Sequence, residues 1–113
     1  MDDTQIKQVE QVLMAARALA KSAEKTFHSG MIKGTGDLAV RSYQQLHARL
    51  AALLPDDDFV TEGLRLDAAA SGADVGDEEK YGQVMLLLGQ MTDYVDGLLK
   101  PARTVTYAIG TEL

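Results

Sequence analysis

Apolar residues recur along this chain with alternating steps of three and four positions, over three separate stretches. The steps average 3.5 residues, so on a helix they keep one apolar face turned toward the same neighbour over many turns. The first stretch runs from Ile6 to Phe27, the second from Ala39 to Leu53 and the third from Tyr81 to Leu98. This pattern predicts helices packed side by side.

Capping residues and helix breakers set the limits of the helices. Asp3 or Thr4 can cap the first helix, which is expected to reach Phe27 or His28 and to end at Gly30 in a left-handed conformation. The second helix is expected over residues 37–54, since the residue that follows is a proline.

A third, shorter helix is expected after Pro55. The acids 56–58 suit its first turn, because negative charge is favourable near the positive end of the helix dipole. Gly63 weakens it by about 1 kcal/mol relative to Ala, so it should depend on packing. Its apolar positions are Phe59, Val60, Leu64, Leu66 and Ala70.

The fourth helix is expected to run from Asp77 to Lys100 and to end at Pro101. In the residues that follow, larger apolar residues alternate with Thr104, Thr106 and Ala108, which is the period of a strand. The apolar positions of this tail are Val105, Tyr107 and Ile109. The sequence therefore predicts an all-α fold, an antiparallel up-down four-helix bundle with a shorter third helix. Residues 1–100 form this single domain, and residues 101–113 form an extended C-terminal tail that packs on the bundle or on a partner.

Composition removes several classes of function. The chain is 46% hydrophobic and 25% charged, which argues against disorder. It has no cysteine, which excludes disulfides, cysteine zinc sites and a thiol nucleophile. No apolar run approaches the ~20 residues that span a bilayer, and the acidic N-terminus does not resemble an export signal. We therefore expect a cytoplasmic protein with no membrane partner.

The net charge of −6 is uneven along the chain. Residues 1–54 have seven basic and five acidic residues, a sum of +2, whereas residues 55–113 have four and twelve, a sum of −8. The favoured interpretation is that the two halves face each other and their rims attract. The alternative is a basic and an acidic surface that recruit different partners.

The motifs that could carry chemistry are incomplete. His28 is expected to interact with carbonyl groups at a helix end, and His47 to be a half-buried packing residue, because no Glu-x-x-His pair supports a di-iron site. Residues 33–37, Lys-Gly-Thr-Gly-Asp, resemble a phosphate cradle but lack the spacing of a P-loop, so they are interpreted as an interhelical loop. We expect no cofactor, no metal site and no small-molecule substrate.

Two alternatives stay open. Carboxylates on the third and fourth helices could hold magnesium in a metal-dependent nucleotide or phosphate-ester hydrolase, and the candidates are Asp58, Glu62, Glu79, Asp93 and Asp96. A basic stripe on the first two helices could bind nucleic acid, although a pI of about 4.7 opposes this. The stripe consists of Arg17, Lys21, Lys25, Arg41 and Arg49.

The favoured function is a noncatalytic interaction or scaffold module that self-associates as a homodimer or binds another protein. Long apolar stripes with apolar flanks can serve a seam between chains as readily as a seam within one chain. The residues expected at the interface are Met85, Leu87 and Tyr94 on the fourth helix, with Val105, Tyr107 and Ile109 in the tail.

Overall fold

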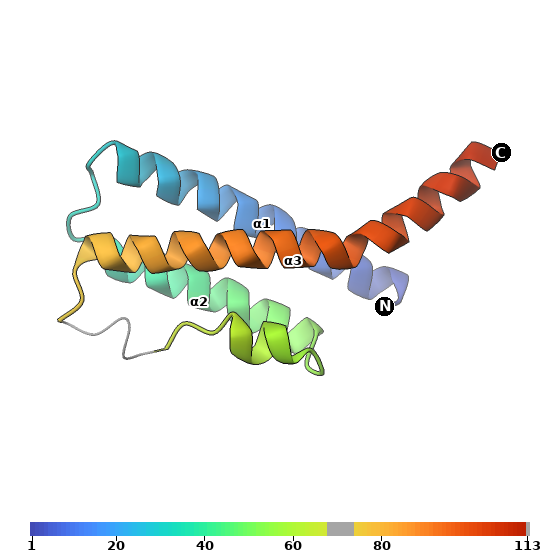
Figure 1. The fold of residues 1–113 in the computed structure, drawn as a ribbon, viewed down its shortest axis with the longest axis horizontal. Coiled ribbons are helices and arrows are strands. Elements are labelled where there is room, and N and C mark those ends of the chain that lie inside the picture. Colours follow the sequence, from blue (N-terminus) through green and yellow to red (C-terminus); the bar gives the residue numbers. More distant parts are fainter. Residues whose placement is uncertain (68–73, 113) are drawn as a thin grey trace.

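The computed structural model describes residues 1–67 and 74–112, with residues 102–112 described by their backbone alone. The element order is α1 (Asp3–His28), α2 (Gly36–Leu53), η1 (Phe59–Gly63) and α3 (Asp77–Glu112). The four helices alternate in direction along the long axis of the molecule (Figure 1). The predicted all-α, up-down four-helix bundle is therefore confirmed.

The first helix begins one residue earlier than expected. Asp2 is its N-cap, and its carboxylate accepts a hydrogen bond of 2.7 Å from the backbone N–H of Gln5. At the other end Gly30 has a φ of 75°, the left-handed conformation that glycine adopts without strain. The predicted end of the first helix is confirmed.

The core is built from the predicted stripes. The largest side chains that are fully buried come from all four helices, and they include Leu13, Tyr43, Leu50, Val60 and Leu88. Ala16 and Ala23 are buried on α1, where their small size lets the neighbouring helices approach closely. The 4-3 spacing therefore identified the faces that meet in the core.

The third helix is shorter than predicted. It is one turn of π-helix, η1, in which Val60 is fully buried and Phe59 packs over Gly63. Leu64 and Leu66 are buried beyond its end in non-helical chain. Ala70, the last expected apolar position of this helix, lies outside the described residues.

The predicted extended tail is wrong. α3 does not end at Pro101 but continues to Glu112, with the proline inside the helix. Pro101 has no N–H to donate to the carbonyl of Gly97, and the helix changes direction in this region and then projects beyond the bundle (Figure 1). The residues after Pro101 are called the α3 extension below (residues 102–112).

The outer face of α3 contains three glycines, Gly82, Gly89 and Gly97. All three are exposed, and a Cβ built on any of them would meet no atom within 4 Å. Leu86 lies on the same face and is 63% exposed. In residues 1–67 and 74–112, no helix has an apolar stretch long enough to cross a membrane.

Candidate functional site

One end of the bundle is closed by a carboxylate of the chain itself. The side chain of Asp77 accepts hydrogen bonds from the backbone N–H groups of Gly34 (2.9 Å) and Gly36 (3.0 Å). Both bonds lower the pKa of Asp77, and the bond from Gly34 is the larger cause. The glycine loop that resembled a phosphate cradle does bind an anion at a helix N-terminus, but that anion is Asp77.

Two further contacts complete this closed end, defined as residues 34–37 with residues 77–81. The ammonium of Lys80, which is 5% exposed, lies 2.7 Å from a carboxylate oxygen of Asp37. The hydroxyl of Thr35 donates to the carbonyl of Ile32, so the hydroxyl of Tyr81, at 2.8 Å, donates to Thr35. Gly36 is required here, because a Cβ would lie 2.6 Å from Asp77 Oδ1.

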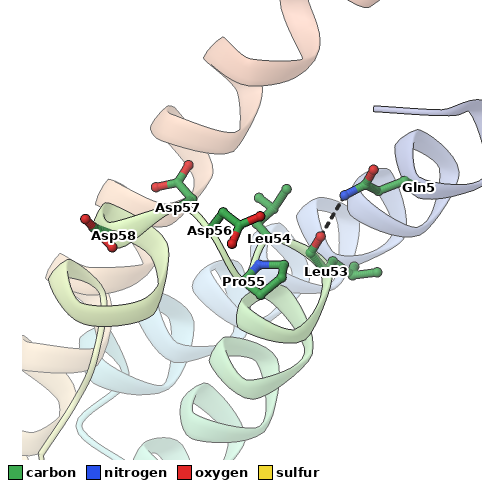
Figure 2. A pocket seen from close by; sticks show the side chains of 7 residues that line it. All are labelled: Gln5, Leu53, Leu54, Pro55, Asp56, Asp57 and Asp58. Carbon is green, nitrogen blue, oxygen red and sulfur yellow. Dashed lines mark hydrogen bonds between the residues drawn. The ribbon is translucent and has the colours of Figure 1, made fainter.

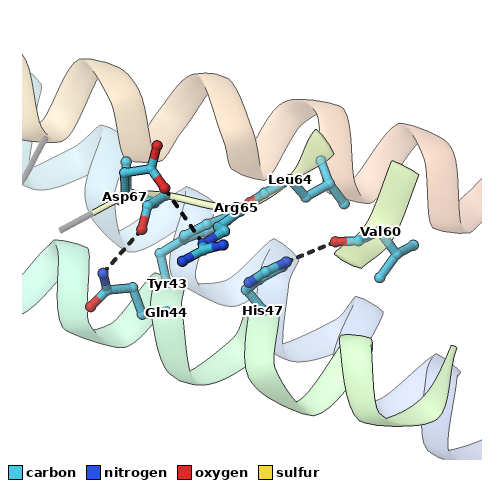
Figure 3. A network of polar contacts seen from close by, with 8 residues as sticks. Tyr43, Gln44, His47, Val60, Leu64, Arg65 and Asp67 are labelled. Carbon is cyan, nitrogen blue, oxygen red and sulfur yellow. Dashed lines mark hydrogen bonds and ion pairs between the residues drawn. The ribbon is translucent and has the colours of Figure 1, made fainter. Parts of the chain in front are cut away.

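Hydrogen-bond donors on α2 hold η1 and the residues that follow it, up to Leu66, in place (Figure 3). These residues, 59–66, are called the η1 segment. The Nε2 atom of His47 lies 2.7 Å from the carbonyl oxygen of Val60, which can only accept, so Nε2 carries the proton. The Tyr43 hydroxyl donates to the carbonyl of Leu64, and burial raises the pKa of Tyr43. Gln44 donates to the carbonyl of Leu66 at 3.2 Å.

His47 has the half-buried packing role expected of it, whereas the contacts of His28 among the described residues are with side chains and not with the carbonyl groups expected. His47 is half-buried, and its ring stacks on that of Tyr43 with centroids 6.2 Å apart. His28 is the last residue of α1 and lies exposed, 3.8 Å from a carboxylate oxygen of Glu24. The hydrogen bond from His47 to the η1 segment was not predicted, because the spacing of residues on α2 does not reveal the partner.

Tyr94, expected at a dimer face, is engaged within the chain. Its hydroxyl donates to Asp57 Oδ2 at 2.6 Å, and this hydrogen bond is the main cause that raises the pKa of Tyr94. Its ring packs on that of Phe59 with centroids 4.5 Å apart. Met85 and Leu87, the other expected interface residues on this helix, are also partly buried against the core of their own chain.

The tail half of the expected interface lies on the α3 extension. The helix continues the 4-3 spacing of the third stripe after Leu98, at Ala102, Val105 and Ile109. Tyr107 is two residues from Val105 and from Ile109, so a helix places it on another side. The sequence contains both signals, since the alternation of Val105, Tyr107 and Ile109 predicts a strand and the 4-3 spacing predicts the helix that the structure has.

The carboxylates of the hydrolase hypothesis do not converge. Glu79 and Asp93 are exposed on one helix, where their separation in sequence corresponds to about 21 Å. Asp58 and Glu62 are exposed beside η1, and Asp96 lies 3.3 Å from the guanidinium of Arg17. Within the described ranges no group of three His, Asp or Glu side chains could hold a metal ion.

The basic stripe does not form one surface either. Arg17 pairs with Asp96 at the rim between the two halves of the chain, as the favoured interpretation of the charge pattern expects. Lys21, Lys25 and Arg41 are exposed. Arg49 instead lines a hollow of about 280 Å³ between α1 and α2, together with Gln8, Gln11, Ala52 and Leu53.

A larger hollow of about 500 Å³ lies next to this one (Figure 2). Its lining residues are Gln5 on one side and Leu53, Leu54, Pro55, Asp56, Asp57 and Asp58 on the other. Gln5 donates a hydrogen bond of 2.7 Å to the carbonyl of Leu53, which borders both hollows. The two hollows and the start of the α3 extension make up what we call the open end of the bundle. Figure 1 shows the start of α1 and the place where α3 leaves the bundle at this end.

No family model, no curated protein and no solved structure matches this chain. Its contacts and surfaces are therefore the basis for any statement about function.

Proposed function

We propose that this chain is a noncatalytic helical interaction module that self-associates at its open end through the α3 extension. One observation carries the proposal. α3 leaves the bundle near Pro101 and continues as a helix whose sequence keeps the apolar 4-3 spacing at Ala102, Val105 and Ile109. Such a seam is stable in water when a second helix covers it.

A second copy of the chain would present an identical seam. Two copies related by a two-fold axis would bury the same residues of each copy against the other. The proposal rests on the α3 extension and not on the rest of the expected interface. Contacts within their own chain already engage Met85, Leu87 and Tyr94.

The seam by itself supports only a weak dimer. Burial of one Val or Ile side chain contributes about 1.5–3 kcal/mol, so Val105 and Ile109 of both copies would supply about 6–12 kcal/mol. Association costs about 4–15 kcal/mol. Because the two amounts are comparable, a stable pair requires a further contact at the open end.

Light scattering across a dilution series of the full chain tests the proposal. We expect the wild type to change from monomer to dimer with rising concentration, and the variant Val105→Asp/Ile109→Asp to remain monomeric. The matched control Thr104→Asp/Thr111→Asp adds the same charge on the other side of the extension and should dimerise. A wild type that is monomeric at high micromolar concentration would contradict the proposal, and so would equal dimerisation of all three proteins.

A further inference from the structure

The hollow between α1 and α2 is lined by one positively charged side chain, that of Arg49, and by uncharged residues. Arg49 is exposed and has no hydrogen bond or ion pair within the described part of the chain. The other lining residues are two glutamines, an alanine and a leucine. In α2 the only acid is Asp37, at the opposite end of the helix. The hollow thus offers a guanidinium and two amide groups, which suit a carboxylate.

The neighbouring turn between α2 and η1 presents the opposite charge. Asp57 is engaged, since its carboxylate accepts from Tyr94 and from the N–H of Val60. Asp56 and Asp58 are exposed, and neither carboxylate has a partner within the described residues. Figure 2 shows both on the turn that borders the larger hollow, on the side opposite Gln5.

The two surfaces are contiguous and complementary. Leu53 borders both hollows, and Gln5, Gln8 and Gln11 continue from one to the other along α1. A two-fold axis passing between an adjacent positive and negative surface places each against the opposite surface of the second copy. Among the described residues, Arg49 forms no ion pair with Asp56 or Asp58 of its own copy.

We propose that the hollow lined by Gln8, Gln11 and Arg49 binds the acidic turn Asp56–Asp58 of a second copy of this chain. Arg49 of each copy pairs with Asp56 or Asp58 of the other, so that the contact occurs twice. This inference rests on the proposed self-association, for which it supplies the second contact that the short seam requires. It also sets the register of the pair, because complementary charges steer and align the two surfaces.

A charge swap in the full chain tests the inference. At low ionic strength we expect Arg49→Glu to weaken dimerisation by about a hundredfold, because a like-charged contact then occurs twice. Asp56→Arg/Asp58→Arg should weaken it similarly, and the variant that combines all three changes should restore it. The control Arg41→Glu makes the same charge change on α2 outside the hollow and should dimerise like the wild type. Thermal unfolding by circular dichroism checks that each variant is folded.

The outcomes separate this inference from the proposed function. A wild type that dimerises, with Arg49→Glu and Arg41→Glu dimerising equally well, would overturn the Arg49 contact and leave the seam standing. A wild type that stays monomeric would overturn both. A monomeric wild type that retains an aspartate-rich peptide only when Arg49 is intact would assign the hollow to another protein's acidic segment and overturn the second copy as its occupant.

Discussion

The closed and open ends of this bundle differ in how their charged side chains are paired within the chain. At the closed end, residues about forty positions apart satisfy one another, since Asp77 accepts from Gly34 and Gly36 and Lys80 pairs with Asp37. At the open end, Arg49 has no partner within the described residues, and two hollows lie between the helices. The difference teaches that charged side chains fasten the helices together at one end, whereas Arg49, Asp56 and Asp58 stay available at the other.

The largest expected effect is steric and falls on the closed end. In Gly36→Ala the new Cβ would meet Asp77 Oδ1 at 2.6 Å and Asp77 Cα at 3.1 Å, so the Asp77 carboxylate must move out of its hydrogen bonds and the backbone of α3 must shift slightly. We expect the free energy of unfolding to fall by about 2–3 kcal/mol, as in other overpacked sites. The control Gly82→Ala enters open space on an exposed helix face and should raise stability by about 0.5–1 kcal/mol. Denaturant unfolding of both variants measures this contrast, which equal effects would contradict.

The next effect concerns the acceptor at the closed end. Asp77→Ala leaves the N–H groups of Gly34 and Gly36 without their carboxylate, so we expect Tm to fall by several degrees. At the open end Asp56 makes no such bond, and Asp56→Ala should leave Tm nearly unchanged. Calorimetry of the two variants in the same buffer distinguishes a structural acid from an available one. A Tm for Asp56→Ala below that of Asp77→Ala would contradict this expectation.

A smaller effect distinguishes the two members of the ion pair between buried Lys80 and exposed Asp37. Asp37→Ala leaves the ammonium of Lys80 nearly buried without a partner and should destabilise the chain by about 1 kcal/mol. The value is low because the Asp37 side chain is 71% exposed, so water already screens the pair. Lys80→Met removes the buried charge and keeps most of the packing, so it should be nearly neutral. Urea titration of both variants checks the order, and a costlier Lys80→Met would contradict it.

The smallest effect is a dependence on pH. The pKa of Asp77 is lower in the folded chain than in the unfolded chain, so its contribution to stability is present above the unfolded value of about 3.9. This contribution is lost as the pH falls through the folded pKa. The difference in Tm between wild type and Asp77→Asn should therefore narrow as the pH drops below about 4. A difference that stays constant over that range would mean that the carboxylate charge contributes nothing at the closed end.

The apolar pattern predicted most of the fold because packing of one face determines where a helix lies. The apolar stripes predicted α1, α2 and the first part of α3. Gly30 predicted the end of α1, because glycine adopts the left-handed conformation found there without strain. The continuation of α3 is not evident from the sequence, because Pro101 indicates a helix end while the spacing of Ala102, Val105 and Ile109 favours a helix that continues. A proline removes one hydrogen bond and bends a helix, but it does not have to end it.

Two sets of contacts could not be predicted from the sequence: those between α3 and the start of α2, and those between α2 and η1. Asp77 reads locally as a first-turn acid of its own helix, and nothing near it in the chain indicates that it caps another helix. His47 donates to Val60, thirteen residues away, through a turn whose path the spacing does not specify. Arg49 was counted in a basic stripe, and only the placement of α1 beside α2 shows that it lines a hollow.

The three exposed glycines of α3 bear on the order in which this chain folds. Gly82, Gly89 and Gly97 make α3 a poor helix in isolation, because glycine gains no packing there and loses the most backbone entropy. α1 and α2 have no glycine except at the first residue of α2, and a short loop joins them. We therefore expect the hairpin of α1 and α2 to form before α3, and the α3 extension to take its place only after α3 has packed on this hairpin.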